Sequence, residues 1–190
     1  MWTLIALVGA LFGPRQQKDS LVRALVIDDV RIRLDSTTTL LAMQAVFGKT
    51  RLHAAQNHDD VAWACYKLPL DSGSVYLQLK SDDMGGPSHD IMGFQLGRTP
   101  PTGVEIAACS PTHRVRSVAT DNQLFIGMAI GDLLSIMHTP TEHRDGRYKF
   151  EYSQQVTEPG VAPYDIGGTL IVETANGRVT RLDASYAATR

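Results

Sequence analysis

The chain has 190 residues, of which 43% are hydrophobic and 20% are charged, and its formal net charge is −2. This length accommodates one large domain or two small ones, and the composition is ordinary for a globular protein. Dedicated nucleic-acid binders usually carry a basic stripe, whereas the Lys and Arg residues here are scattered. We therefore expect no nucleic-acid partner.

An apolar run, residues 4–12, stands near the N-terminus and is followed by Gly13-Pro14-Arg15. It has about half of the ~20 residues that a membrane-spanning helix needs, and it resembles the hydrophobic region of a signal peptide. No Lys or Arg precedes it and the cleavage pattern is weak, so a buried N-terminal strand or helix is the alternative. We interpret residues 1–15 as a signal-like leader of a periplasmic or secreted protein that has no stable membrane span.

A strand and a short helix are predicted first after the leader. Alternating apolar residues over 30–34 indicate the strand. Ser36 or Thr37 can cap the helix, and Gly48 is typical of a helix C-terminus. The apolar stripe of this helix is formed by Leu40, Met43 and Phe47. Two strand-like runs, 61–68 and 74–80, follow the helix.

The second half of the chain echoes the first. Ile130, Leu133 and Met137 form another helical stripe, and Pro140 prevents the helix from continuing. Three strand-like runs follow, at residues 147–153, 168–174 and 178–186. The last two are joined by Asn176-Gly177, the strongest hairpin signal in the chain.

This internal echo predicts an α+β fold made of two tandem small units. Each unit would have short helices packed on an antiparallel sheet. The break at Ser110-Pro111-Thr112-His113 places the boundary, so we expect a first unit at residues 20–110 and a second at 111–190.

A resemblance to a known family rests on the second unit. Gly127-Met128 leads into the helical residues 132–137 and Pro140, and an aromatic strand and a hairpin follow. This order resembles the SmpA/OmlA family, whose best-known member is a small lipoprotein of the outer-membrane barrel-assembly machinery. The resemblance implies two short helices on a three-stranded antiparallel sheet. The tandem arrangement is similar to that of secreted β-lactamase inhibitor proteins, which join two such units into one curved sheet. No partner-contacting residue can be carried over.

The two cysteines, Cys65 and Cys109, lie in apolar strand-like runs. In an exported chain an even count favours one disulfide, which could stabilise the fold by roughly 3–4 kcal/mol. In a cytosolic chain, two buried free thiols are the alternative. We predict the disulfide together with export.

The sequence lacks the motifs of common active sites. It has no Gly-x-Ser-x-Gly elbow, and Gly85-Gly86-Pro87 is not followed by the Lys-Ser/Thr of a phosphate-binding loop. Two loose histidine groups, neither with the spacing of zinc ligands, are His53 and His58 beside Asp59 and Asp60, and His138 and His143 beside Asp145. We therefore expect a protein that is not an enzyme and that holds no metal or cofactor.

Aromatic residues on the predicted strands suggest a binding surface. Tyr and Trp are enriched at the energetically dominant positions of protein interfaces. Tyr76 shares its strand face with Gln78 and Lys80, while Tyr66 and Trp63 lie on opposite sides of their strand. We predict that Tyr76, Tyr66 and Trp63 contact a protein partner, in a non-enzymatic exported module that binds protein or associates with the envelope. The alternatives are a small hydrolase-like enzyme that uses a histidine cluster, and a purely structural envelope protein.

Overall fold

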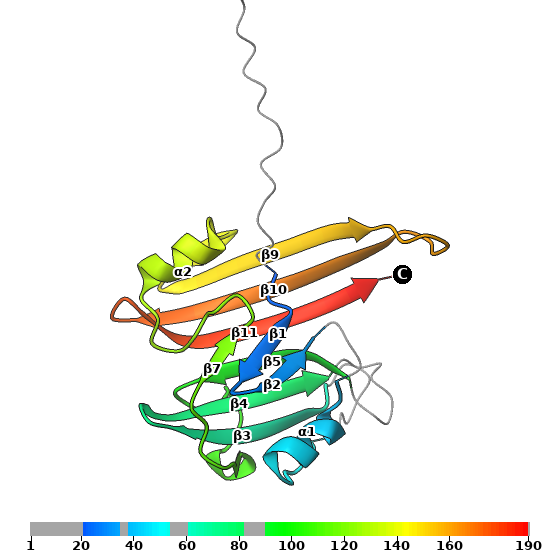
Figure 1. Ribbon diagram of the computed structural model, residues 1–190. Helices are drawn as coiled ribbons and strands as arrows, with labels where there is room; N and C mark the ends of the chain where they lie inside the picture. The colour runs from blue at the N-terminus through cyan, green and yellow to red at the C-terminus, as the bar shows by residue number, and fades with distance from the viewer. Residues whose placement is uncertain (1–20, 35–37, 54–60, 82–89, 190) are drawn as a thin grey trace, which may run out of the picture.

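A computed structural model describes residues 21–34, 38–53, 61–81 and 90–189 (Figure 1). The fold is mainly β, with 52% of the described residues in strands and 13% in helices. The predicted α+β fold of two units, each with helices packed on a sheet, is therefore wrong. The leader at residues 1–15 and the predicted helix caps Ser36 and Thr37 lie outside the described residues.

The larger of the two sheets has eight strands in the order β6-β3-β4-β5-β11-β10-β9-β8. All neighbours are antiparallel except the short parallel pair of β3 and β6. In that order the strands are β6 (Ser110–Pro111), β3 (Trp63–Leu70), β4 (Gly73–Ser81), β5 (Ile91–Gly97), β11 (Arg178–Thr189), β10 (Tyr164–Ala175), β9 (Arg147–Val156) and β8 (Glu142–Arg144).

The junction between β5 and β11 explains why two separate units do not form. These strands pair from Gly93↔Ser185 to Gly97↔Arg181, so the two halves of the chain build one continuous sheet. The smaller sheet also combines strands from both halves of the chain. It contains β2 (Val30–Arg33), β1 (Ala24–Ile27) and β7 (Val118–Thr120) in that order. Such long-range pairings leave no local sequence signal.

The described residues form two α-helices of eight residues each, and the sequence predicted a short helix at both places. In α1 (Leu40–Phe47) the stripe residues Leu40, Met43 and Phe47 are buried, as predicted. Thr39 caps this helix, since its hydroxyl accepts a hydrogen bond of 3.0 Å from the amide of Ala42. Gly48 ends it with a φ of 94°, which glycine adopts easily. In α2 (Ile130–Met137) Leu133 and Met137 are buried.

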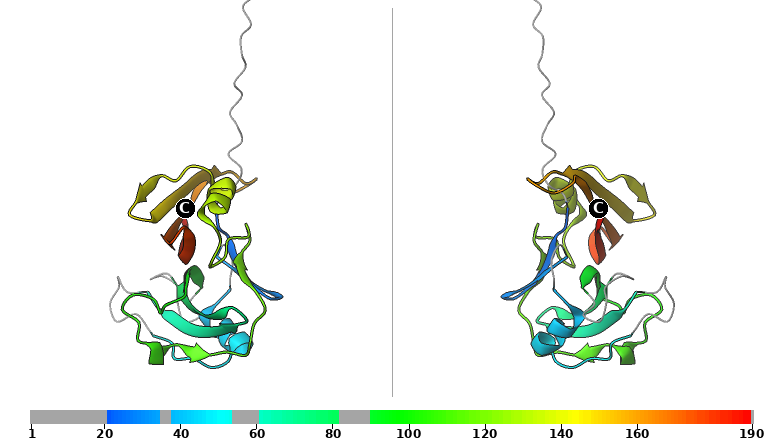
Figure 2. Two further views of the ribbon diagram at one scale, coloured as in Figure 1. Left: turned by 90° about the vertical axis from the view of Figure 1, so that its left-hand side faces the viewer. Right: turned by 90° about the vertical axis from the view of Figure 1, so that its right-hand side faces the viewer.

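The larger sheet has one covered face and one open face. The smaller sheet, α1 and α2 lie on the same side of it, and the larger sheet curves away from them, which makes the open face concave (Figure 2). One hydrophobic core joins the covered face to these elements. It includes Leu25, Ile32, Phe47, Tyr66, Leu77, Phe94, Leu133, Phe150, Val172 and Leu182. Within the described ranges no helix is long and apolar enough to cross a membrane.

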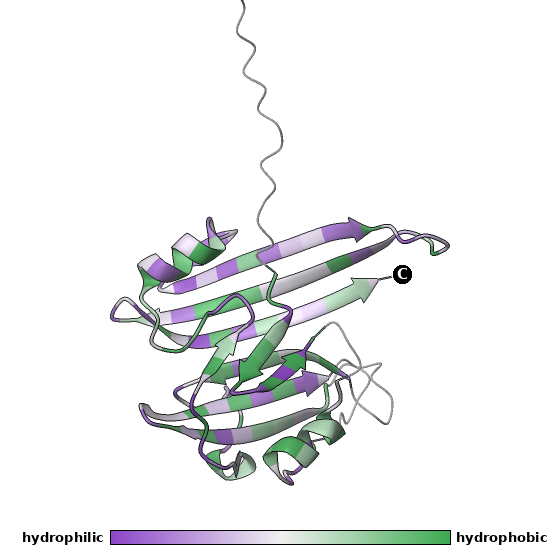
Figure 3. Cartoon of the chain, in the orientation of Figure 1, coloured by the Kyte–Doolittle hydropathy of each residue, from purple (hydrophilic) through white to green (hydrophobic). Residues whose placement is uncertain are grey.

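Side chains alternate between the two faces of the larger sheet along β4 and β9, as the sequence pattern predicted. Apolar and polar bands follow each other along both strands (Figure 3). The hairpin between β10 and β11 is also confirmed. Asn176 and Gly177 both have positive φ values, 51° and 71°, which is the backbone of a type I′ turn.

Candidate functional site: the open face of the larger sheet

The open face is defined by the strand register. Lys67, Tyr76, Gly97 and Arg181 follow one another across β3, β4, β5 and β11. The next row is Cys65, Gln78, Gln95, Asp183, Ile171 and Lys149. The row after that is Trp63, Lys80, Gly93, Ser185, Thr169 and Glu151. Apart from Cys65 and the glycines, these side chains are half-buried or exposed.

Two of the three predicted binding residues lie on this face. Tyr76 is half-buried in the middle of its row, between Lys67 and Gly97. Trp63 lies at the β3 side of the sheet, where its ring stacks on that of His53 at a centroid distance of 3.7 Å. The Trp63 ring is therefore held by His53, and both Trp63 and Tyr76 stay partly accessible.

Tyr66 lies on the covered face, so its predicted contact with a partner needs correction. Its exposed fraction is 0%, and its ring packs on Phe47 with centroids 5.4 Å apart. Burial raises the pKa of the Tyr66 phenol to about 12. Its hydroxyl has no hydrogen-bond partner among the described residues. Tyr66 is thus a core residue.

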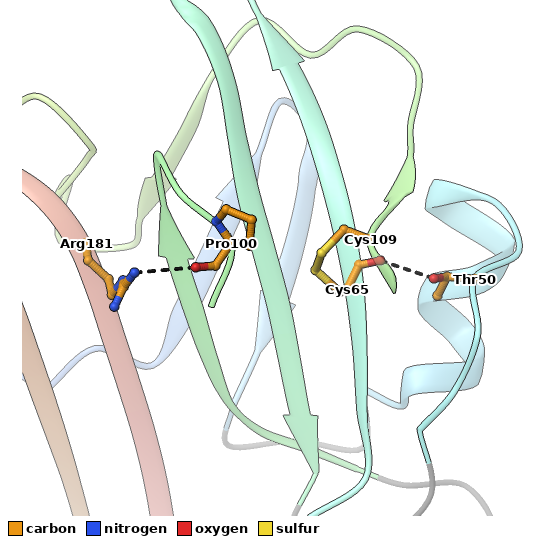
Figure 4. The surroundings of a disulfide bond; sticks show 5 residues. All are labelled: Thr50, Cys65, Pro100, Cys109 and Arg181. Atoms are coloured by element: carbon orange, nitrogen blue, oxygen red, sulfur yellow. Dashed lines mark hydrogen bonds between the residues drawn. A yellow bond between two sulfur atoms is a disulfide. The ribbon is translucent and has the colours of Figure 1, made fainter. Parts of the chain in front are cut away.

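The cysteines form the predicted pair on the open face. The sulfur atoms of Cys65 and Cys109 are bonded at 1.96 Å, and the Cα atoms lie 4.4 Å apart (Figure 4). Cys65 is on β3 as predicted, but Cys109 follows the short 3-10 helix η1 (Ile106–Ala108) instead of lying in a strand. The disulfide therefore fixes the segment between β5 and β6 onto β3.

Arg181 holds the other end of that segment. Its guanidinium donates to the Thr99 hydroxyl at 3.0 Å and to the Pro100 carbonyl at 3.5 Å (Figure 4). Its Nη1 atom also lies 3.4 Å from a carboxylate oxygen of Glu173. Residues 98–109 are thereby attached to both halves of the larger sheet, and we call them the tethered loop.

A polar cluster occupies the centre of the open face. Lys80 donates to Asp183 Oδ1 at 2.8 Å, and the amide of Gln95 donates to Asp183 Oδ2 at 2.9 Å. The side-chain oxygen of Gln95 is buried and has no hydrogen-bond partner among the described residues. Of this cluster, only the position of Lys80 was predicted from the sequence, because Asp183 comes from β11, which is far along the chain from β4 and β5.

Two shallow hollows flank the centre along β9 and β10. One, of about 510 Å³, is lined by Glu151, Ser153, Gly167, Thr169 and Ser185. A Cβ atom on Gly167 would stand 3.3 Å from the Tyr152 carbonyl oxygen, which is a tight contact, so glycine keeps the floor of this hollow low. The other, of about 480 Å³, is charged and is lined by Glu142, Arg144, Arg147, Lys149 and Glu173.

The histidine groups do not gather into a described metal site. Within the described residues, no three His, Cys, Asp or Glu side chains are placed to hold a metal ion. Burial, with a smaller contribution from Arg51, lowers the pKa of His53. His143 stacks on Tyr148 at a centroid distance of 4.0 Å. His58, Asp59 and Asp60 lie outside the described residues.

Comparison with known proteins adds no functional information. No family model matches the chain, and neither the curated proteins nor the solved structures contain a significant match. The resemblance to the SmpA/OmlA family and to tandem inhibitor proteins therefore stays a prediction.

Proposed function

We propose that the protein is a non-enzymatic, exported module that binds a protein partner with the open face of its larger sheet. The observation that carries this proposal is a difference between the two faces of the larger sheet. The covered face packs against the smaller sheet and both α-helices, whereas the open face keeps half-buried aromatic and charged side chains. Tyr76 and Trp63 are of the residue types that dominate interface energetics.

Rigidity of the open face supports the same proposal. The Cys65–Cys109 disulfide and the hydrogen bonds of Arg181 fix the tethered loop to the open face. A surface that is ordered before binding loses less conformational entropy when a partner docks. Disulfides persist in oxidising compartments, so the cysteine pair supports an export to the periplasm or the exterior.

The test is affinity capture from a cell-envelope extract with three matched baits. These are the wild-type protein, Tyr76→Ala on the open face, and Leu41→Ala on the exposed side of α1, where Leu41 is 49% exposed. We expect one saturable partner that binds the wild type and Leu41→Ala equally and Tyr76→Ala at least about tenfold more weakly. A partner lost with Leu41→Ala and retained by Tyr76→Ala would move the site to the covered side.

A further inference from the structure

A separate cavity of about 300 Å³ opens on the other side of the larger sheet, between it and the smaller sheet. Its floor includes Val75 and Leu96, which are 1% and 0% exposed. Phe125 and Ile126 supply further apolar wall, and 45% of the Phe125 surface remains exposed. The volume lies at the lower end of the ~300–1,000 Å³ that small-molecule sites occupy.

Two arginines also line this apolar cavity. Arg98 donates to the Ser72 carbonyl at 2.9 Å, and no carboxylate among the described residues lies within ion-pair distance of it. Because a carbonyl is neutral, this bond leaves the positive charge of Arg98 uncompensated. A planar guanidinium beside an apolar cavity is suited to a carboxylate that carries an alkyl chain.

Arg116 contributes less net positive charge to the cavity than Arg98, because two aspartates lie near its guanidinium. Its guanidinium lies 4.0 Å from Asp28 and 3.8 Å from Asp29, and 82% of its side chain is exposed. Asp28 itself accepts hydrogen bonds of 2.9 Å from the amides of Arg116 and Ser117, which lower its pKa against the opposing effect of burial. The net positive charge at the cavity therefore comes mainly from Arg98.

We propose that this cavity binds a medium-chain alkyl carboxylate, with the chain between the two sheets and the carboxylate at Arg98. The proposal does not rest on the open face, which lies on the opposite side of the larger sheet. Each additional methylene that enters the cavity should tighten binding by up to about fourfold, until the cavity is filled. Charge recognition predicts that an alkyl alcohol of the same length binds more weakly.

The experiment uses the full chain and titrates decanoate and decyltrimethylammonium below their micelle concentrations, and decanol below its aqueous solubility. Amide chemical shifts in NMR spectra report both the affinity and the location of binding. We expect saturable binding of one decanoate, with shifts at Val75, Leu96 and Phe125. Decanoate should bind roughly fivefold to tenfold more tightly than decanol, and the ammonium compound should bind most weakly.

Two charge-matched variants locate the carboxylate. Arg98→Gln should abolish the tighter binding of decanoate relative to decanol. Arg144→Gln removes an exposed arginine elsewhere and should leave this difference in affinity unchanged. Phe125→Ala should weaken both ligands. A retained spectrum without ligand confirms that each variant is folded. The proposal fails if decanoate does not saturate, if the shifts cluster on the open face, or if both arginine variants behave alike.

Discussion

Lys80 Nζ lies 2.8 Å from Asp183 Oδ1, which links β4 to β11 across the intervening β5. The register explains why the two side chains meet. Lys80 is paired with Gly93, and Gly93 is paired with Ser185 on β11. Because Gly93 has no side chain, the lysine can extend over β5 to reach the carboxylate. This ion pair therefore connects the two halves of the chain.

Loss of this ion pair should destabilise the protein modestly. Both side chains are about a quarter exposed, at 27% and 26%, so the coupling between Lys80→Met and Asp183→Asn in a double-mutant cycle should be about 1 kcal/mol. Urea unfolding measures it. The same cycle at Arg144 and Asp145, which are 83% and 87% exposed, should give almost no coupling. Strictly additive effects at Lys80 and Asp183 would show that the pair does not hold the halves together.

A side chain at Gly93 should weaken the junction between β5 and β11. A Cβ atom there would stand 2.8 Å from the Ala184 carbonyl oxygen, so Gly93→Ala forces the backbone apart. We expect a loss of about 1–3 kcal/mol in the free energy of unfolding. Gly131→Ala is the matched control, because that glycine lies in α2 with open space around it. It should stabilise the protein by roughly 0.5–1 kcal/mol. Equal effects of both substitutions would contradict the close approach of β5 and β11.

The disulfide should contribute strongly to stability. It closes a sequence separation of 44 residues, for which the chain-entropy model gives about 4 kcal/mol. The double variant Cys65→Ala/Cys109→Ala should lower the free energy of unfolding by roughly this amount, and reductant should have no further effect on it. Urea unfolding with and without reductant measures both. A wild-type protein insensitive to reductant, with two alkylatable thiols after isolation from its native compartment, would refute the disulfide.

Tyr66 predicts a specific response to high pH. Its pKa is about 12 in the folded protein, above the usual value near 10, so the unfolded chain loses this proton first. The contribution of Tyr66 to the free energy of unfolding is complete below about pH 10. It falls as pH rises toward 12, by up to about 3 kcal/mol. Tyr66→Phe also removes a hydroxyl without a described partner, so it should be neutral or stabilising near pH 8.

The measurement compares the free energy of unfolding of wild type and Tyr66→Phe at about pH 8 and about pH 11.5. At the higher pH the free energy of unfolding of Tyr66→Phe should rise relative to that of the wild type. The remaining tyrosines are common to both proteins, so their titration cancels in this comparison. An unchanged difference between the two proteins would place the Tyr66 hydroxyl in contact with water.

Local patterns in the sequence predicted local structure. The stripe of α1, the end of this helix at Gly48 and the turn at Asn176-Gly177 depend on neighbouring residues, and the structure confirms each. The strand face on which Tyr76 lies could also be predicted, because β4 alternates between buried and half-buried side chains. Such features need no knowledge of distant parts of the chain.

Long-range pairing accounts for what the sequence did not reveal. The fold class was wrong because strands far outweigh helices among the described residues, and because β1 pairs with β7 to build a second sheet. On β3, Ala64, Cys65 and Tyr66 are all buried, since Cys65 is covered by its disulfide to the tethered loop. This interrupts the alternation that would have assigned Tyr66 to the covered face. The cluster of Lys80, Gln95 and Asp183 required the distant pairing of β5 with β11.

In the proposed function, the open face of the larger sheet contacts a protein partner. Site-specific photo-crosslinking tests this contact, with a benzoylphenylalanine in place of Gln78 on the open face or of Leu41 on the opposite side. The proposal predicts one crosslinked partner from the Gln78 position, which is competed by unlabelled protein and lost when Tyr76→Ala is added. A crosslink from the Leu41 position alone, or one that survives Tyr76→Ala unchanged, would contradict it.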